Sequence, residues 1–164
     1  ILRKNCKPLR NVGDEEAARM RRMREFMYEA EGVGLAGPQV GWSVRVVILD
    51  VEQDGQGDRI FINPRLIESE GQVVEEEGCL SLPGLTAPVP RAERVRVVAY
   101  TLQGERMEED VDGLRARVWQ HEIDHLNGVL FIDRLEPTTL VRLRRQLKKL
   151  ELEKEEAAPA GTVG

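Results

Sequence analysis

The sequence predicts an α+β fold with a largely antiparallel sheet, because strand-like segments fill the middle of the chain and helical segments fill both ends. Residues 33–111 are rich in β-branched runs separated by Gly, Pro and Asp clusters, which is typical of strands and turns. Apolar residues at helical spacing precede and follow this region. The composition is that of a globular protein, since 41% of the 164 residues are hydrophobic and 32% are charged.

The first predicted helix begins at Asp14, an N-cap residue followed by two glutamates that suit the positive end of the helix dipole, and it ends at Gly32. Its apolar residues recur every three or four positions and share one face: Ala17, Met20, Met23, Phe26, Met27 and Ala30. Methionines in such a stripe indicate core packing rather than a cofactor site.

The middle of the chain contains four predicted strands, at 44–51, 59–62, 72–74 and 94–102. The stretch 55–57 reads as a surface hairpin or loop. The glycine-rich segment 32–39 lacks the Lys-Ser/Thr pair of a phosphate-binding loop and the preceding strand of a dinucleotide-binding motif. We therefore expect it to be a helix exit followed by a loop packed against another element.

Two further helices are predicted after the strands. One spans about 113–126 and stops at Asn127-Gly128. The other follows Pro137 and has leucines along one face, at positions 140, 143, 147 and 150. We expect residues 1–156 to form a single domain and residues 157–164, rich in Ala, Pro and Gly, to be a disordered tail.

Charge and hydropathy exclude several functions. A net charge of −5 argues against a general affinity for nucleic acid, and no sequence-specific nucleic-acid partner is expected. Apolar runs such as 46–49 and 129–132 are far shorter than the roughly 20 residues of a membrane span. Two distant cysteines, Cys6 and Cys79, would make a thin disulfide framework, so we expect free thiols and a cytoplasmic protein. An organellar protein would need a targeting segment before Ile1.

The strongest chemical signal is the run QHEIDH at 120–125, which contains the pattern HExxH and both histidines of the chain. Residues four apart on a helix share a face, so His121 and His125 could bind one metal ion. Glu122 could then approach a water on the metal without being a ligand itself. Asp124 is a candidate for orienting the ligands, or it is an ordinary exposed helix residue.

A catalytic site of this kind holds three protein ligands, and the residues leave the third one open. A third histidine six positions after the second is ruled out by Phe131. A downstream glutamate would be Glu136 or one from the last helix, which is strongly charged and expected to be solvated. Cys79 in the run EGCLS is favoured, because a thiolate is a good soft ligand and the glycine before it permits a close backbone approach. Its alternative role is that of a small buried hydrophobe.

Taken together, three segments resemble the peptide deformylase family, which is marked by GxGxAAPQ, EGCLS and QHExDHLxG in that order. Here they read GVGLAGPQ at 32–39, EGCLS at 77–81 and QHEIDHLNG at 120–128. The one departure is Gly37, where the family usually has Ala, and it removes no chemical group. The leucine at position 80 and the long C-terminal helix match the bacterial type. The resemblance implies antiparallel sheets around a central HExxH helix.

The resemblance implies that Cys79, His121 and His125 are metal ligands, with Fe²⁺ as the metal and Zn²⁺, Ni²⁺ or Co²⁺ able to substitute. Glu122 would be the general base and then the general acid as metal-bound water attacks the formyl carbon. The substrate would be the N-formyl group of formyl-methionine on nascent polypeptides, released as formate. The oxyanion would be bound by Gln39, whose role from the residues alone is open between oxyanion donor and ordinary loop glutamine, and by the backbone N–H of Leu80.

Four small or apolar residues flank the motifs, and we expect them to bind the substrate and to form its methionine pocket: Val33, Gly34, Leu114 and Val118. Core packing is the alternative for the three apolar ones. Two other functions compete with deformylation. A different HExxH peptidase or amidase would cleave internal peptide bonds, and a non-enzymatic metal-binding or ribosome-docking module would leave Glu122 without a role. The last helix carries a basic set of side chains that could contact the ribosome, although its glutamates favour a solvated helix: Arg142, Arg144, Arg145, Lys148 and Lys149.

Overall fold

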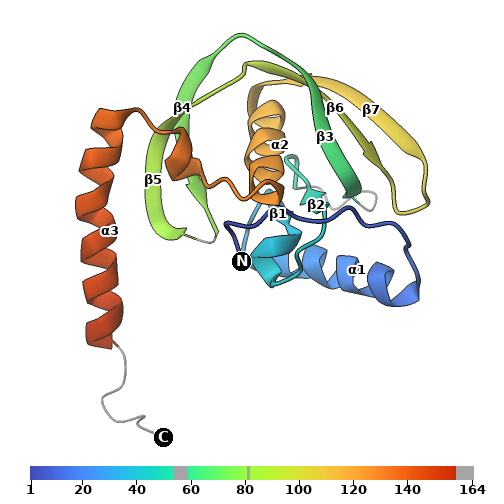
Figure 1. The fold of residues 1–164 in the computed structure, drawn as a ribbon, viewed down its shortest axis with the longest axis horizontal. Helices are drawn as coiled ribbons and strands as arrows, with labels where there is room; N and C mark the ends of the chain where they lie inside the picture. Colours follow the sequence, from blue (N-terminus) through green and yellow to red (C-terminus); the bar gives the residue numbers. More distant parts are fainter. Residues whose placement is uncertain (54–58, 81, 158–164) are drawn as a thin grey trace, which may run out of the picture.

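A computed structural model describes residues 1–53, 59–80 and 82–157 of the chain. The expected α+β class is confirmed, with helices at both ends and antiparallel sheets between them (Figure 1). The helices are α1 (Asp14–Glu29), α2 (Gly113–Leu126) and α3 (Pro137–Ala157), with short 3₁₀ turns η1 (Gly37–Val40) and η2 (Phe131–Arg134). The strands are β1 (Gly34–Ala36), β2 (Val46–Leu49), β3 (Ile60–Glu70), β4 (Val73–Cys79), β5 (Leu82–Arg91), β6 (Arg94–Tyr100) and β7 (Arg106–Asp112).

The strands form two sheets. Five of them pair in the order β1-β2-β3-β6-β7, and β4 pairs with β5 in a separate hairpin, all antiparallel. Several of these elements differ from the sequence prediction. The segment expected to be a loop at 32–39 forms β1 and η1, and the hairpin covers far more than the predicted strand at 72–74. The expected loop at 55–57 and the tail from 158 onward lie outside the described residues, whereas Ala157 ends α3.

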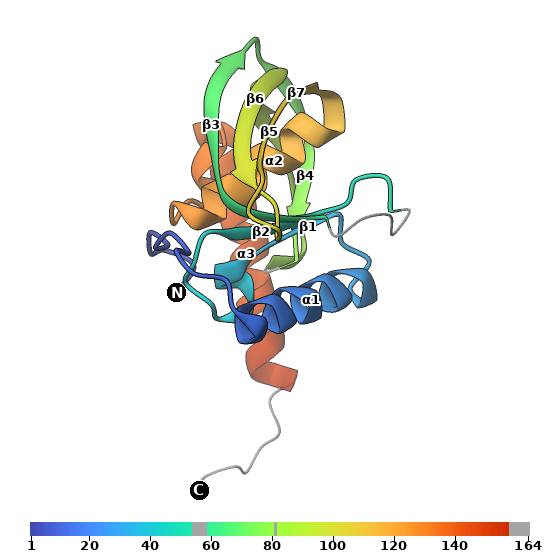
Figure 2. The same cartoon turned by 90° about the vertical axis from the view of Figure 1, so that its right-hand side faces the viewer.

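All four residues of β2 are apolar and buried, so the sheet packs against a helix on each face at this strand. Val46 and Ile48 pack with the buried methionines of α1, while Val47 and Leu49 belong to the cluster that includes Trp119 of α2. Figure 2 shows α1 lying across the β1–β2 end of the molecule. Burying a side chain of this size stabilises the fold by about 1.5–3 kcal/mol. The packing of α1 and α2 on the two faces of β2 therefore holds the neighbouring strand β1 beside α2.

The β4–β5 hairpin lies on the other side of α2 and is held there by a third apolar cluster. Leu85 and Val89 of β5 pack with Phe131 of η2 and with Leu143, the buried leucine near the start of α3. α3 therefore stands beside the hairpin (Figure 1).

The helix α2 ends at the predicted stop, where Gly128 has φ 73° and a Cβ would lie 2.5 Å from the carbonyl oxygen of Arg3. This arrangement places α2 between β1 and β4. No helix among the described residues is long and apolar enough to cross a bilayer.

Candidate metal centre and catalytic cavity

The two histidines of α2 point toward the same spot. The Nε2 atoms of His121 and His125 are 3.2 Å apart, and both rings are buried. The spacing of four residues produces this geometry, because it places both rings on one helix face, as the sequence predicted. Within the described residues, Nδ1 of His125 has no hydrogen-bond partner. Two imidazole nitrogens that converge in this way are suited to sharing a cation.

Cys79, at the end of β4, completes this cluster. Its Sγ lies 3.3 Å from Nε2 of His125, and the ligand atoms of Cys79, His121 and His125 all lie within 4.8 Å of one another. One soft thiolate and two imidazoles form a donor set that fits a divalent transition metal with an open coordination position. The alternative ligand Glu136 lines a different cavity, together with Asp124 and Arg134.

Burial controls the protonation of this cluster. Burial raises the pKa of Glu122 to about 7, with the charge of Glu77 adding to the effect. Burial and the charge on His121 lower the pKa of His125 to about 3. Burial opposes a proton on His121, but its contacts with Cys79 and Glu77 raise its pKa to about 10. A cation at these nitrogens would compete with that proton, since imidazole binds metals in its neutral form.

Glu77 orients His121 from outside the ligand cluster. Its Oε1 is hydrogen-bonded to Nδ1 of His121, which leaves Nε2 to face the cluster. Arg91 donates to both oxygens of Glu77, over 3.1 and 2.7 Å, and Arg117 donates to Oε2 over 2.9 Å. Burial alone would raise the pKa of Glu77, but hydrogen bonds from His121 and Arg91 hold it at about 2. A carboxylate that fixes the tautomer and orientation of a ligand histidine is a common feature of metal sites.

Asp124, the residue that the sequence offered for orienting the ligands, is buried, and within the described residues it makes no hydrogen bond to a histidine nitrogen. It accepts hydrogen bonds from Arg91 and Arg134 instead. The alternative of an ordinary exposed helix residue is wrong, since Asp124 is 7% exposed. The sequence interpretation missed Glu77, Arg91 and Arg117 as partners of the site, although Glu77 opens the EGCLS run.

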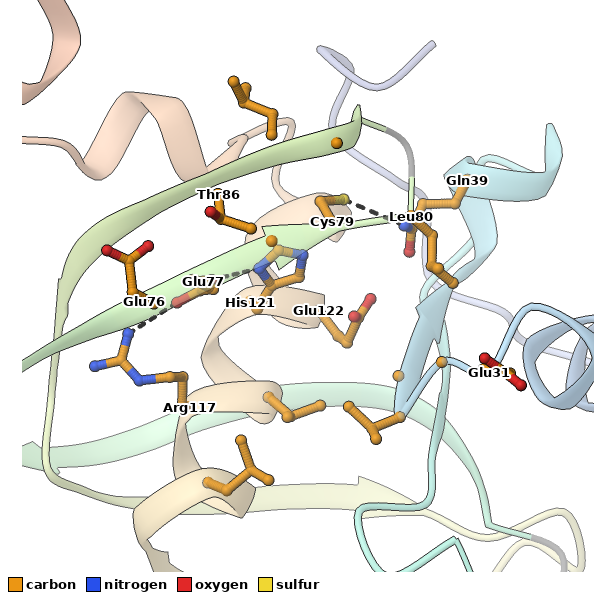
Figure 3. A pocket seen from close by; sticks show the side chains of 18 residues that line it. Glu31, Gln39, Glu76, Glu77, Cys79, Leu80, Thr86, Arg117, His121 and Glu122 are labelled. Atoms are coloured by element: carbon orange, nitrogen blue, oxygen red, sulfur yellow. Dashed lines mark hydrogen bonds and ion pairs between the residues drawn. The ribbon is translucent and has the colours of Figure 1, made fainter. Parts of the chain in front are cut away.

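A cavity of about 480 Å³ opens beside the cluster (Figure 3). Its walls include nearly all of the residues singled out in the sequence: Val33, Gly34, Gln39, Cys79, Leu80, Leu114, Val118, His121 and Glu122. His125 lies behind them and is 1% exposed. Glu31, Glu76, Thr86 and Arg117 also line the cavity and were not predicted. Residues from α1's exit, β1, η1, the β4–β5 hairpin and α2 thus meet at one hollow.

Glu122 and Gln39 flank the cluster from different elements. Oε2 of Glu122 is buried and has no hydrogen-bond partner within the described residues. The Gln39 side chain is oriented by its own turn, because its Oε1 accepts a hydrogen bond from the N–H of Ala36 over 2.8 Å. Its Nε2 therefore points to the cluster, 3.6 Å from Sγ of Cys79. A basic carboxylate and an amide donor now stand on either side of the open face of the cluster.

Gly34 explains why β1 can lie so close to Glu122. A Cβ at this position would be 2.8 Å from Oε1 of Glu122 and 2.8 Å from Cγ1 of Val118. Gly37, the residue that departs from the motif, is equally confined, since its Cβ would be 2.6 Å from the carbonyl oxygen of Trp42. Both glycines permit a close approach of backbone to a neighbour. At position 37 the family usually has Ala, so the tight contact with Trp42 is a feature of the backbone of this chain.

An α+β fold that presents an HExxH helix and a cysteine to one cavity defines a hydrolase of the HExxH metalloenzyme class. Comparison with known proteins gives the family. The family model described as polypeptide deformylase matches residues 1–140. A peptide deformylase of Chromobacterium violaceum is 48% identical over 129 residues, covering 79% of this chain and 77% of that protein. One of a Thermotoga species is 45% identical over 148 residues, covering 90% of this chain and 88% of that protein.

Solved structures agree. The crystal structure of a peptide deformylase from Legionella pneumophila is 39% identical and superposes with a TM-score of 0.86, covering 96% of this chain and 93% of that one. The chain belongs to the polypeptide deformylase family. It is accordingly an enzyme, a metallohydrolase that removes the N-formyl group from nascent polypeptides.

Proposed function

We propose that this chain deformylates formyl-methionine at the start of nascent polypeptides with an Fe²⁺ ion held by Cys79, His121 and His125. The observation that carries the proposal is the convergence of one sulfur and two Nε2 atoms within 4.8 Å beside a cavity. Zn²⁺, Ni²⁺ or Co²⁺ would fit the same donors. When bound, a divalent cation would lower the pKa of water from 15.7 to about 7 and so supply hydroxide near neutral pH.

Glu122 is the proposed proton carrier. It lines the cavity, its Oε2 is free of protein partners within the described residues, and its pKa of about 7 suits both accepting and donating a proton at neutral pH. In the proposed reaction, Glu122 takes a proton from the attacking water as the new C–O bond forms at the formyl carbon. It returns that proton to the amine nitrogen as the C–N bond breaks, giving formate and a free N-terminus.

Gln39 and the N–H of Leu80 are the proposed oxyanion donors. The hydrogen bond from Ala36 fixes the amide of Gln39 before substrate arrives, and Leu80 follows Cys79 directly at the cavity wall. Donors oriented in advance stabilise developing charge most effectively, and removing one typically costs about 3–4 kcal/mol. A narrow site of this kind accepts a formyl group, which carries only hydrogen, and resists larger acyl groups.

The substrate peptide is proposed to lie between two strand edges. β1 is an edge strand of the large sheet and β4 is hydrogen-bonded only to β5, in the part of the chain that is described. Both strands contribute to the cavity wall. An extended peptide could bind these edges through its main chain, with its methionine side chain in the pocket of Val33, Leu114 and Val118 and its backbone against Gly34. This would make binding largely independent of the residues after methionine.

The decisive assay measures formate released from a formyl-methionine tripeptide by protein of known metal content. We expect turnover that falls about 100- to 10,000-fold in Glu122→Gln while the metal content is unchanged. Cleavage of internal peptide bonds without formate would identify a different HExxH hydrolase. Retained turnover in Glu122→Gln would refute the role of Glu122. For the pocket, Val118→Phe should raise KM for the formyl-methionine peptide, and an unchanged KM would refute that assignment.

Residues 1–156 are proposed to act as one catalytic domain in the cytoplasm, with a ribosome contact through α3. The five basic side chains of the last helix named above are exposed, which makes them available to an anionic surface. A variant with Arg144, Arg145 and Lys148 changed to Glu should lose cosedimentation with ribosomes and keep full activity on a free peptide. Unchanged cosedimentation would reject the contact and leave α3 as a solvated helix.

A further inference from the structure

An exposed arginine outside the cavity, Arg134, is connected to the metal-ligand cluster by an unbroken series of ion pairs. Arg134 lies in η2, and its side chain is 49% exposed. Its Nε and Nη2 donate to the two oxygens of Asp124 over 3.1 and 2.8 Å. Among the contacts of the described residues, Arg134 is the only donor to Oδ1 of Asp124. Within the described residues, Arg134 therefore donates two of the three hydrogen bonds that the Asp124 side chain accepts.

Asp124 connects Arg134 to the buried residues around His121. Its Oδ2 accepts a hydrogen bond from Nη1 of Arg91 over 2.5 Å. The other two donor groups of Arg91, Nε and Nη2, hold Glu77, and Glu77 holds Nδ1 of His121. Because the guanidinium of Arg91 is rigid and planar, a shift of Nη1 also moves Nε and Nη2, the two nitrogens that donate to Glu77. The orientation of a ligand ring is thereby coupled to a surface residue.

We propose that Arg134 is a positioning residue for the metal centre, acting on His121 through Asp124, Arg91 and Glu77. The inference rests on the proposed binding of a metal by Cys79, His121 and His125. Within the described residues, Arg134 neither lines the catalytic cavity nor contacts Cys79, His121 or His125, so its effect is on how firmly His121 is held. Arg134 is the last residue of η2, three positions before α3 begins at Pro137.

Replacing Arg134 by Gln is expected to loosen the series without collapsing it. Asp124 keeps Arg91 as its partner, and water can reach the oxygen that Arg134 releases, because Asp124 and Arg134 line a second cavity of about 630 Å³. Loss of a group that directly orients a metal ligand typically costs 10- to 100-fold in metal affinity. Since Arg134 acts through intermediates, we expect zinc to leave the site about 3- to 10-fold faster.

The test loads the full chain with Zn²⁺ and measures the rate of zinc transfer to a colorimetric chelator. Arg134→Gln should release zinc about 3- to 10-fold faster than the wild type, and Arg134→Lys should recover part of the loss. The matched control is Arg94→Gln, because Arg94 also forms a two-point ion pair with an aspartate, at 2.7 and 2.9 Å, and its side chain is 58% exposed. Arg94→Gln should leave the rate unchanged.

A purely structural role is tested with Met23→Ala, a core variant in the α1 cluster remote from the site. If Arg134→Gln acts only by destabilising the fold, Met23→Ala should release zinc at least as fast, and that result would overturn the proposal. The visible absorption of the Co²⁺ form should shift in Arg134→Gln and not in Met23→Ala. The double variant Arg134→Gln/Asp124→Asn should release zinc no faster than Asp124→Asn, because both residues act in one series.

The outcomes separate the two levels of inference. A wild-type chain that retains no zinc refutes the proposed metal centre, and the positioning role with it. If the wild type retains zinc and both Arg134→Gln and Arg94→Gln retain it equally firmly, only the positioning role is refuted. Formate release then still tests the proposed function independently.

Discussion

Gly34 offers the sharpest test of the catalytic geometry, because its effect on Glu122 can be worked out from the backbone. In Gly34→Ala, the new Cβ would be 2.8 Å from Oε1 of Glu122, whereas ordinary contact begins at 3.4 Å. The carboxylate must therefore move by about 0.6 Å, or β1 must retreat by as much. A displacement near 1 Å in a catalytic group costs on the order of 100-fold. We expect kcat/KM to fall about 10- to 100-fold, which corresponds to about 1.4–2.7 kcal/mol in the activation barrier.

The assay is formate release from a formyl-methionine tripeptide, with zinc or iron content measured on the same sample. Metal content should not change, since the predicted clashes involve Glu122 and Val118 and none of the ligands. The double variant Gly34→Ala/Val118→Ala removes one of the two clashing groups and should recover part of the activity. Full activity in Gly34→Ala would mean that the close approach of β1 to Glu122 is irrelevant to catalysis and would refute this account.

Three other variants test separate parts of the structure. Cys79→Ser should weaken zinc retention at least about tenfold in chelator competition, and unchanged retention would exclude the sulfur as a ligand. Leu143→Ala should lower the free energy of unfolding by about 2–5 kcal/mol in urea titration, whereas Val141→Ala, at a 59% exposed position of the same helix, should have little effect. Burial and the hydrogen bond to Asp50 raise the pKa of Tyr28 from 10 to about 12, so the native fold favours the protonated phenol. Its contribution to stability is complete below pH 10 and is lost as the pH rises toward 12, and the stability difference between wild type and Tyr28→Phe should shrink over that range.

The helical parts of the fold were predictable because their signals are local. Helical spacing and the Asn127-Gly128 stop each lie within a few residues of the boundary they determine. The predicted N-cap is wrong by one residue, since Gly13 caps α1 and Asp14 is its first helical residue, and the helix ends at Glu29 rather than at Gly32. The three methionines of the predicted face of the first helix, Met20, Met23 and Met27, are buried, whereas Phe26 of that face is 48% exposed. The strand predicted at 44–51 contains β2, whose four apolar residues are all buried.

The strands that were missed owe their conformation to their partners. β5 contains Pro83, Pro88 and Pro90, which argue against a strand. Proline is tolerated there because β5 pairs only with β4 in the part of the chain that the structure describes, which leaves its other edge open. β7 is strongly charged and has little intrinsic strand preference. Asp110 and Glu108 form ion pairs with Arg94 and Arg96 of β6, so cross-strand pairing supports a strand that its composition does not favour.

The proposed metal ligands could be predicted from local spacing, whereas the residues that support them could not. His121 and His125 are four residues apart, so helix geometry alone brings them together, and a shortage of donors then points to Cys79. The partner of His121 could not be found by such counting, because Glu77 is 44 residues away and the chain offers many carboxylates. Strand alternation supplies the missing constraint. Once Cys79 faces α2, Glu77, two residues earlier on the same strand, must face it as well, and a buried carboxylate there requires the cations that Arg91 and Arg117 provide.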